Sequence, residues 1–275
     1  VTEALAAHVV DSKLEAIPRD VQDEAKRAIF NYLGCALGGS IEPALDVAIR
    51  TLAPYSGNAT ASVLGRTERF DVLHAALMNG IGSHVHEYDD TLPKNFIHPS
   101  VPVASALFAH ASAHPTSGRD FVHAFILGFE VESRIGNAVF PAHYNAGWHI
   151  TSTTGVFGAA AAVGKLLGLT TKQLVWAFGV AATQAAGLRE MFGSMAKSFQ
   201  PGRAAQNGYT AALLGRAAKA KDKQEIAYAI PKEGSLLWID VAAVPKDAPN
   251  PANALRFLDF LLEPKVAAAS SELTG

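Results

Sequence analysis

The sequence contains one cysteine, Cys35, so an intramolecular disulfide and an iron–sulfur cluster held by several thiolates of this chain are both excluded. Cys35 lies in the apolar run FNYLGCALGGS, which favours a buried structural thiol over a catalytic one. Charge is also scarce: only 17% of the 275 residues are charged and the net charge is −2. Without a basic excess, nucleic-acid binding is not expected.

Long apolar runs are missing as well. No stretch of about 18 residues is free of polar breaks, so no transmembrane helix is expected. The first twenty residues, VTEALAAHVVDSKLEAIPRD, lack a basic segment followed by an apolar one, which is the pattern of a signal peptide. The sequence therefore predicts a cytoplasmic protein without a membrane partner.

Strand signals are nearly absent from residues 1–218, whereas Ala- and Gly-rich segments with helical spacing follow one another. Many of these segments are apolar on most faces, which is typical of helices buried on several sides. We predict a mainly α fold with a large helical domain over residues 1–218. The expected helices are DVQDEAKRAIFNYLGCAL, VLHAALMNGIGSHVHEY, SVPVASALFAHASAH, GRDFVHAFILGFEVESRIGNAV, TTGVFGAAAAVGKLLGL, TTKQLVWAFGVAATQAAGL and GRAAQNGYTAALLGRAAKA.

The composition changes at KAKDK, residues 219–223. After it, EIAYAIPKEG and SLLWIDVAAVP have strand patterns, and NPANALRFLDFLLEPKVAAASSEL has an amphipathic helical pattern. We predict a short α/β fragment of β–β–α order over residues 219–275. A two-stranded fragment of this size is marginally stable on its own.

Titratable residues concentrate in HVHEYDDTLPKNFIHP, residues 84–99, which contains three histidines, three carboxylates and a lysine. The pattern predicts a helix ending near Tyr88, a loop, and a second helix capped by Ser100. Polar side chains at helix ends around a loop are well placed to line a cleft. A metal site through His84, His86 and Asp89 is the less favoured reading, since no known ligand spacing is present. A structural reading, in which the two aspartates cap helices or pair with a lysine, stays open.

Two further segments carry candidate site residues. NAGWHITSTTGVF places His149 just before a predicted helix N-terminus, where unpaired N–H groups favour anions, and its Ser/Thr residues add hydroxyl donors. In GSMAKSFQPGRAAQNG, Lys197 and Arg203 bracket a predicted Gly/Pro turn and are suited to hold a carboxylate or phosphate. His149 as a core histidine and the two cations as surface charges remain the alternatives.

These segments together resemble the MmgE/PrpD family, which includes 2-methylcitrate dehydratase, cis-aconitate decarboxylase and iminodisuccinate epimerase. The motifs NYLGCALGG, HVHEYDDT…HPS, GWHITSTTGVFGAAAA and GSMAKSFQPGRAAQNG occur in family order over about residues 1–215. The resemblance implies a large helical domain, usually dimeric, followed by a smaller α/β domain that supplies a further lysine and a tyrosine. It also implies acid–base chemistry without a metal or organic cofactor.

The resemblance further implies roles for individual residues of this chain. Glu87 stands where many relatives carry aspartate, and Gln200 replaces a histidine that is common among them. The implied catalytic residues are His98, His149, Asp90 and Thr91, and the implied substrate-binding residues are Lys197, Arg203 and Glu87.

Residues 216–275 do not continue this resemblance. They are instead similar to part of a periplasmic putrescine/spermidine-binding protein, and the segment WID implies an amine site made of Trp238 and Asp240. An aromatic face beside a carboxylate suits an alkylammonium ion.

Three hypotheses follow. The chain is a lyase or isomerase of the 2-methylcitrate dehydratase type that acts on a small polycarboxylate and forms a homodimer through its helical domain. Alternatively, it is an inactive or truncated composite scaffold, or a polyamine-binding module through its C-terminal fragment.

Overall fold

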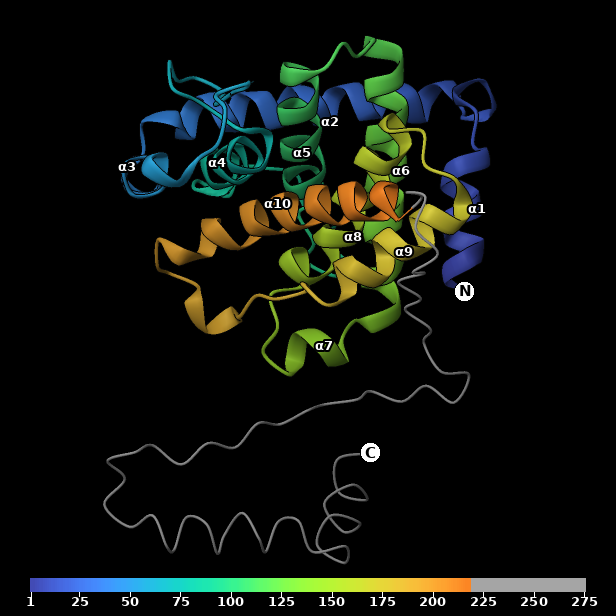
Figure 1. The fold of residues 1–275 in the computed structure, drawn as a ribbon. Helices are drawn as coiled ribbons and strands as arrows, with labels where there is room; N and C mark the ends of the chain where they lie inside the picture. Colours follow the sequence, from blue (N-terminus) through green and yellow to red (C-terminus); the bar gives the residue numbers. More distant parts are fainter. Residues whose placement is uncertain (219–275) are drawn as a thin grey trace, which may run out of the picture. The chain divides into compact units, whose positions relative to one another are not determined.

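The computed structural model describes residues 1–218, and these fold into a layered bundle of helices (Figure 1). The predicted α/β fragment of residues 219–275 lies outside the described residues. The α-helices are α1 (Thr2–Asp11), α2 (Arg19–Gly38), α3 (Pro43–Leu52), α4 (Val72–His84), α5 (Ser100–Ala113), α6 (Gly118–Val139), α7 (Ala142–Asn145), α8 (Ile150–Leu166), α9 (Thr171–Ala182) and α10 (Ala196–Ala217). Short 3₁₀ turns are η1 (Leu14–Ala16), η2 (Gly39–Ile41), η3 (Ala53–Tyr55) and η4 (Arg189–Met191).

A small hairpin interrupts the helices between α3 and α4. Strands β1 (Ala61–Ser62) and β2 (Arg69–Phe70) pair antiparallel, with Ala61 opposite Phe70. Apart from this hairpin and two isolated bridges, the described residues hold no strand pairing, so the predicted mainly α fold is confirmed.

Three of the described helices, α4, α6 and α9, begin where a side chain satisfies free N–H groups of the first turn. The Asp71 carboxylate accepts from the backbone N–H groups of Leu73 and His74 at the start of α4. The Ser117 hydroxyl caps α6, and Thr170 forms a capping box with Gln173 at the start of α9. Each such cap is worth about 1 kcal/mol.

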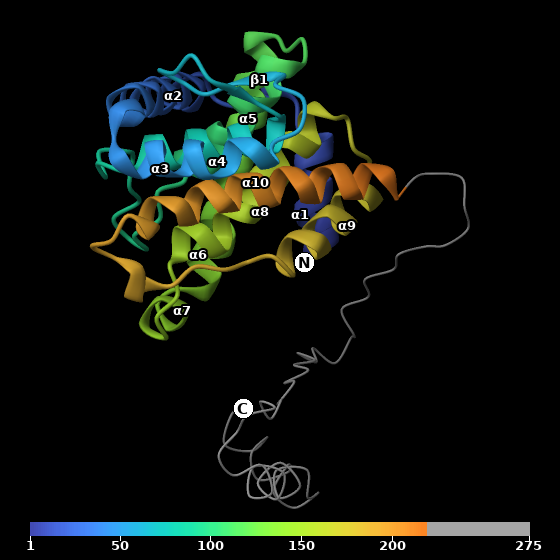
Figure 2. The ribbon, with the colours of Figure 1, turned by 60° about the vertical axis from the view of Figure 1, so that its left-hand side comes forward.

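The core lies where α8, α4 and α10 meet. α8 packs against α10, α6 and α5, while α4 packs against α10, α5 and α2, as Figures 1 and 2 show from two sides. Nearly every residue of α8 and all of 75–84 in α4 are buried. The prediction of helices enclosed on several sides is therefore confirmed, and it explains why their sequences show little amphipathic pattern. Cys35, on α2, is buried as expected, and burial together with the negative charges of Asp89 and Asp90 raises its pKa to about 11.

Three predicted boundaries are wrong. α4 ends at His84 rather than near Tyr88, because Glu87 adopts a left-handed φ of 57° that a helix cannot contain. Ser100 is the first residue of α5 rather than its cap, and its hydroxyl donates to Asp90. No turn separates Lys197 from Arg203, because α10 runs continuously through Pro201.

Among the residues that the structure describes, no helix combines the length and the apolar character needed to cross a membrane.

Candidate active site

The loop between α4 and α5, residues 85–99, is held against α6 at its far end. Ile97 is fully buried, and a Cβ at Gly136 of α6 would lie 2.0 Å from its Cδ1 atom, so only glycine allows this contact. The Asn95 amide donates to Asn137 of the same helix at 2.8 Å. The neighbouring residue His98 is fixed as well, since its backbone N–H donates to the Thr151 hydroxyl of α8 at 3.0 Å.

The crossing of α4 and α10 brings His84, at the end of α4, close to Lys197, at the start of α10. A Cβ at Gly80 would lie 2.3 Å from the Cα of Gly202, so the two backbones touch at this point. Gly80 precedes His84 by one helical turn, and Gly202 follows Lys197 by little more than one. The pair of glycines therefore sets how closely the C-terminus of α4 approaches the N-terminus of α10.

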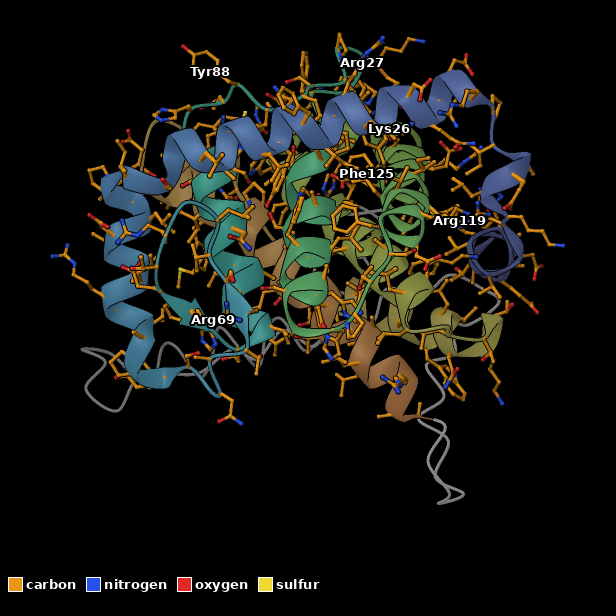
Figure 3. All side chains as sticks on the ribbon, turned by 90° about the horizontal axis from the view of Figure 1, so that it is seen from above. Lys26, Arg27, Arg69, Tyr88, Arg119 and Phe125 are labelled. Atoms are coloured by element: carbon orange, nitrogen blue, oxygen red, sulfur yellow. The ribbon has the colours of Figure 1, made fainter. Side chains whose placement is uncertain are left out.

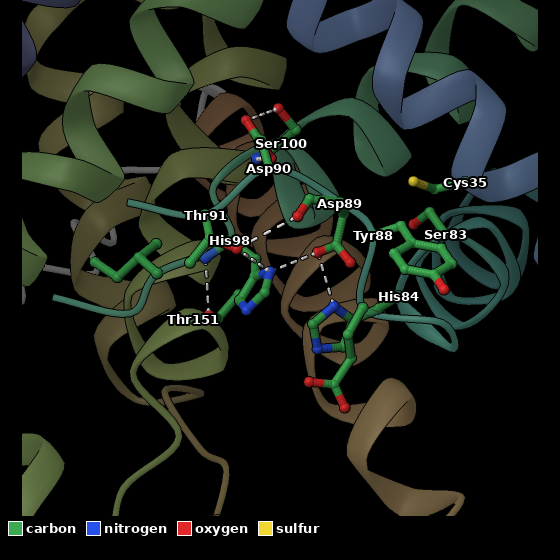
Figure 4. A network of polar contacts seen from close by, with 12 residues as sticks. Cys35, Ser83, His84, Tyr88, Asp89, Asp90, Thr91, His98, Ser100 and Thr151 are labelled. Carbon is green, nitrogen blue, oxygen red and sulfur yellow. Dashed lines mark hydrogen bonds and ion pairs between the residues drawn. The ribbon is translucent and has the colours of Figure 1, made fainter. Parts of the chain in front are cut away.

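Asp89 joins two histidines of the loop (Figure 4). Its Oδ2 atom accepts from Nδ1 of His84 at 2.8 Å and from Nδ1 of His98 at 2.9 Å. The side chains of His84 and Asp89 are fully inaccessible to solvent, and that of His98 is 14% exposed. A carboxylate bonded to Nδ1 fixes the ring orientation and leaves Nε2 as the atom free for chemistry.

The pKa values of this group follow from burial and pairing. Burial alone would raise the pKa of Asp89, but the charges and hydrogen bonds of His84 and His98 outweigh it, and the pKa lies well below its usual range. Burial likewise opposes protonation of His98, but the Asp89 carboxylate overcomes this and raises the pKa of His98. His98 is therefore a suitable proton donor near neutral pH.

His149 approaches the same group from α8, where it is the residue before the first helical turn, as predicted. Its backbone N–H donates to the carbonyl of Gly187 at 3.0 Å, and its ring stacks on His84 with centroids 6.0 Å apart. Burial, together with the positive charges of His84, Lys197 and His98, lowers the pKa of His149 to about 3. Its Nδ1 atom is buried without a hydrogen-bond partner. The ring is therefore neutral at pH 7.

The hydroxyl groups after His149 do not serve as free donors, contrary to expectation. The hydroxyls of Ser152 and Thr154 donate to the backbone carbonyls of Gln200 and Ile150 at 2.8 and 2.7 Å. Thr153 lies 2.8 Å from a ring nitrogen of His143. Inside an apolar helix these hydroxyls must find partners within the protein, because no water reaches them.

Lys197 lies in the first turn of α10 and lines a cavity together with His84 of the histidine group. The cavity measures about 390 Å³ and is lined by Glu42, Pro43, Ala44, His84, Val85, Glu87, Gly193, Ser194, Met195, Lys197 and Ser198. The Lys197 ammonium group pairs with the Glu87 carboxylate and sits 4.8 Å from the centre of the Phe192 ring. The structure thus brings Lys197 and Glu87 together beside His84, and the positive charge of Lys197 acts on both His98 and His149.

Asp90 faces away from the histidines. Its carboxylate accepts from the hydroxyl and the backbone N–H of Ser100 at 2.6 and 3.2 Å, as Figure 4 shows. Burial raises the pKa of Asp90 to about 6, and the charge of Asp89 adds to this, although the Ser100 hydrogen bonds oppose it. Glu132, fully buried on α6, has a pKa raised well above its usual value by burial and by Asp90. The predicted role of Asp90 toward substrate stays a prediction.

The two remaining predicted residues differ in position. The Thr91 hydroxyl lies 3.2 Å from Nδ1 of His98, so it belongs to the group. Arg203 is exposed and donates to the Gln206 amide oxygen at 2.6 Å. Six residues along a helix turn the chain by about 240°, which sends Arg203 to a different face from Lys197. The expected pairing of these two cations at a turn is therefore wrong.

Sequence reasoning missed the two residues at the centre of the group, Asp89 and His84. Both were considered only for a metal site or for capping, whereas Asp90 was preferred on the strength of the family resemblance. The signal in the sequence was the spacing of five residues between His84 and Asp89. Because α4 ends at His84, the chain can turn back and place the Asp89 carboxylate on the His84 ring.

The same atoms bear on metal binding. Within the described part of the chain, ligand atoms of His84, Asp89 and His98 lie within 4.8 Å of one another, close enough to surround an ion. In this geometry both Nδ1 atoms already point at one Asp89 oxygen, so the carboxylate acts as their shared hydrogen-bond acceptor. The absence of a metal cofactor stays a prediction. The predicted amine site, Trp238 and Asp240, lies outside the described residues.

The described residues thus form a helical bundle in which a buried, carboxylate-linked histidine group lies beside a lysine. The chain belongs to the MmgE/PrpD family, since the model of the MmgE/PrpD N-terminal domain matches residues 3–219. The resemblance inferred from the four sequence motifs is thereby confirmed.

Several characterised proteins are similar to the chain. It is 35% identical over 225 residues to a cis-aconitate decarboxylase-like protein of Aspergillus oryzae, covering 78% of this chain and 47% of that protein. It is 34% identical over 205 residues to cis-aconitate decarboxylase of Aspergillus terreus, covering 72% and 42%. The human enzyme of that name is 30% identical over 220 residues, covering 78% and 46%. The chain thus spans about half the length of these relatives.

A second, separate similarity concerns a short segment. Over 58 residues, 21% of this chain, it is 43% identical to a putrescine-binding periplasmic protein of Pseudomonas aeruginosa, covering 16% of that protein. The chain therefore shows likeness to two unrelated kinds of protein, as the sequence predicted.

Proposed function

We propose that the protein is a lyase or isomerase that acts on a small polycarboxylate by acid–base chemistry of its own side chains. One observation carries the proposal: His98 and His149 contact the same ring, His84, yet their pKa values are moved in opposite directions. Two neighbouring titratable groups with separated pKa values are suited to act as acid and base.

The roles follow from these positions. Neutral His149 accepts the proton from the carbon next to a substrate carboxylate, and Lys197 holds that carboxylate and stabilises the charge that develops on it. In a dehydration, protonated His98 delivers its proton to the departing hydroxyl group, so that water and a carbon–carbon double bond result. Asp89 holds His98 in place and offsets its positive charge.

Two reactions of a tricarboxylate are the candidates. Dehydration of 2-methylcitrate is the reaction expected from the sequence motifs. Decarboxylation of cis-aconitate is supported by the names of the relatives at 30–35% identity. In that reaction the bond to a carboxylate breaks, carbon dioxide leaves, and an acid such as His98 protonates the carbon. Incubation of the purified full chain with each compound, followed by NMR of the products, distinguishes loss of water from loss of carbon dioxide.

A pair of variants on α10 tests the binding role. Lys197→Ala should raise KM about ten- to a hundredfold, because a partly buried charge-assisted contact to a carboxylate is lost. Arg203→Ala removes the same charge from an exposed position and should leave KM within about twofold. Equal effects of the two substitutions, or turnover of neither tricarboxylate by the parent protein, would count against the proposal.

We also propose that the protein is a homodimer. Exposed apolar side chains on and beside α2 support this: Phe30 of α2 is 79% exposed, Ile41 of the following turn η2 is 77% exposed, and Tyr88, whose carbonyl accepts from Asn31 of α2, is 80% exposed. Figure 3 shows α2 crossing this face with Tyr88 projecting outward. Exposed apolar groups of this size on one face commonly mark a protein interface, and sedimentation velocity tests the dimer.

A further inference from the structure

We propose that Glu87 is an internal competitor for the substrate: its carboxylate occupies the position on Lys197 that a substrate carboxylate must take. The inference rests on the proposed function, in which Lys197 binds a polycarboxylate. It adds a specificity-determining role for Glu87, because only an anion that displaces this side chain gains access to the lysine.

The contact between the two side chains is direct. The Glu87 carboxylate pairs with the Lys197 ammonium group, whose side chain is only 12% exposed, whereas that of Glu87 is 52% exposed. Phe192 lies 4.8 Å from the ammonium group on its other side. The lysine is therefore enclosed, and Glu87 stands between it and solvent.

The backbone at Glu87 is held in an uncommon conformation. Its φ of 57° lies in the left-handed region, and its N–H donates to the carbonyl of His84 at 3.2 Å. A residue with a Cβ adopts this conformation at a cost of about 1 kcal/mol, and such outliers gather at functional sites. The tight turn after α4 is thus what directs the Glu87 side chain toward α10.

A second glutamate in the same cavity has a different partner. Glu42 also lines the space around Lys197, but its carboxylate oxygen lies 3.4 Å from Nε2 of His86. The residue precedes α3 and makes no side-chain cap there. Glu87→Gln and Glu42→Gln each remove one negative charge from the same cavity. Only Glu87→Gln removes the ion-pair partner of Lys197.

The consequence is a penalty on binding. A substrate carboxylate that pairs with Lys197 must first break the pair with Glu87 and then accept a second negative charge nearby. Because Glu87 is half exposed, we expect a modest effect: Glu87→Gln should tighten anion binding about two- to fivefold. Glu42→Gln should change binding by less than that.

Two measurements on the full-length chain test the proposal. The first is the rate at which acetic anhydride acetylates Lys197, followed by mass spectrometry in the parent, Glu87→Gln and Glu42→Gln proteins. The second is calorimetry with tricarballylate, a tricarboxylate that carries no leaving group. We expect faster acetylation of Lys197 and tighter tricarballylate binding in Glu87→Gln alone.

The outcomes separate this inference from the proposed function. An unchanged acetylation rate in Glu87→Gln, weaker tricarballylate binding in that variant, or equal gains in Glu42→Gln would overturn the role of Glu87. Faster acetylation in Glu87→Gln with no tricarballylate binding by any of the three proteins would support the pairing of Glu87 with Lys197, but it would overturn the polycarboxylate site on which the competition depends.

Discussion

Among the described residues, His98 and His110 are both enclosed by apolar helices, and they differ in their hydrogen-bond partners. At the candidate active site, His98 meets the Asp89 carboxylate at 2.9 Å. Near the end of α5, His110 meets the Tyr209 hydroxyl at 2.8 Å and stacks on His114 with centroids 4.5 Å apart. Burial opposes the charged form of both rings, but only Asp89 supplies a compensating negative charge.

The difference decides what each histidine can do. The pKa of His98 is raised, whereas burial and the positive charges of His114 and Arg216 lower the pKa of His110 to about 4. At neutral pH, His110 is a neutral hydrogen-bonding group within the core. Of these two rings, His98 is therefore the candidate proton donor, and His110 is a packing residue.

Removal of a ring from the active-site group should have the largest effect. We expect His149→Ala to lower kcat about 10²- to 10⁴-fold, the range for loss of a positioned proton-transfer group. Turnover measured by NMR, with circular dichroism to confirm the fold, tests this. Equal rates for the variant and the parent would contradict the role of His149.

Replacement of the Asp89 carboxylate should lower the pKa of His98, as the lack of a carboxylate partner does for His110. In Asp89→Asn the His98 ring keeps a polar neighbour but loses the negative charge, so burial should lower its pKa below the ordinary value and turnover should fall about 10- to 10³-fold. An NMR titration of the His98 ring measures the shift. Asp90→Asn is the matched control: its carboxylate bonds to Ser100 and acts on His98 through charge alone, so this substitution should lower the pKa of His98 less than Asp89→Asn does.

The smallest expected effect is that of His110→Phe, which should change the free energy of unfolding but not turnover. His110→Phe leaves the buried Tyr209 hydroxyl without its partner, so unfolding at pH 7.5 should become easier by about 1–3 kcal/mol while kcat stays the same. The pH dependence has a definite sign. The unfolded chain protonates His110 near pH 6.5, but the folded protein does so only near pH 4. The parent should therefore lose stability on acidification through this window, by at most about 1.4 kcal/mol per pH unit.

The variant lacks this titrating group, so the stability gap between the two proteins should narrow between pH 7.5 and pH 5. Urea unfolding at each pH measures the gap. A gap that stays constant, or a variant with lowered turnover, would mean that His110 is not the neutral packing residue described above.

The helices of this fold were largely predictable because their signals are local. Apolar spacing, together with the caps at Ser117 and Thr170, located α6 and α9, and the four motifs identified the family. Boundaries failed where a single residue adopts an uncommon conformation. The left-handed φ of Glu87 ends α4 early, and a glutamate side chain gives no indication of this backbone conformation. Pro201 was interpreted as part of a turn, although a proline early in a helix breaks few hydrogen bonds.

The amino-acid sequence by itself determined the mainly α class of residues 1–218, the family, and the three segments that carry the candidate site. Only the tertiary structure decided that Asp89 rather than Asp90 holds the histidines, that Arg203 points elsewhere, and that Glu87 occupies Lys197. The physical reason is the range of the interactions. Helices and caps form within a few residues, whereas the site depends on the contacts of Gly80 with Gly202 and of Ile97 with Gly136, which join residues distant in the sequence.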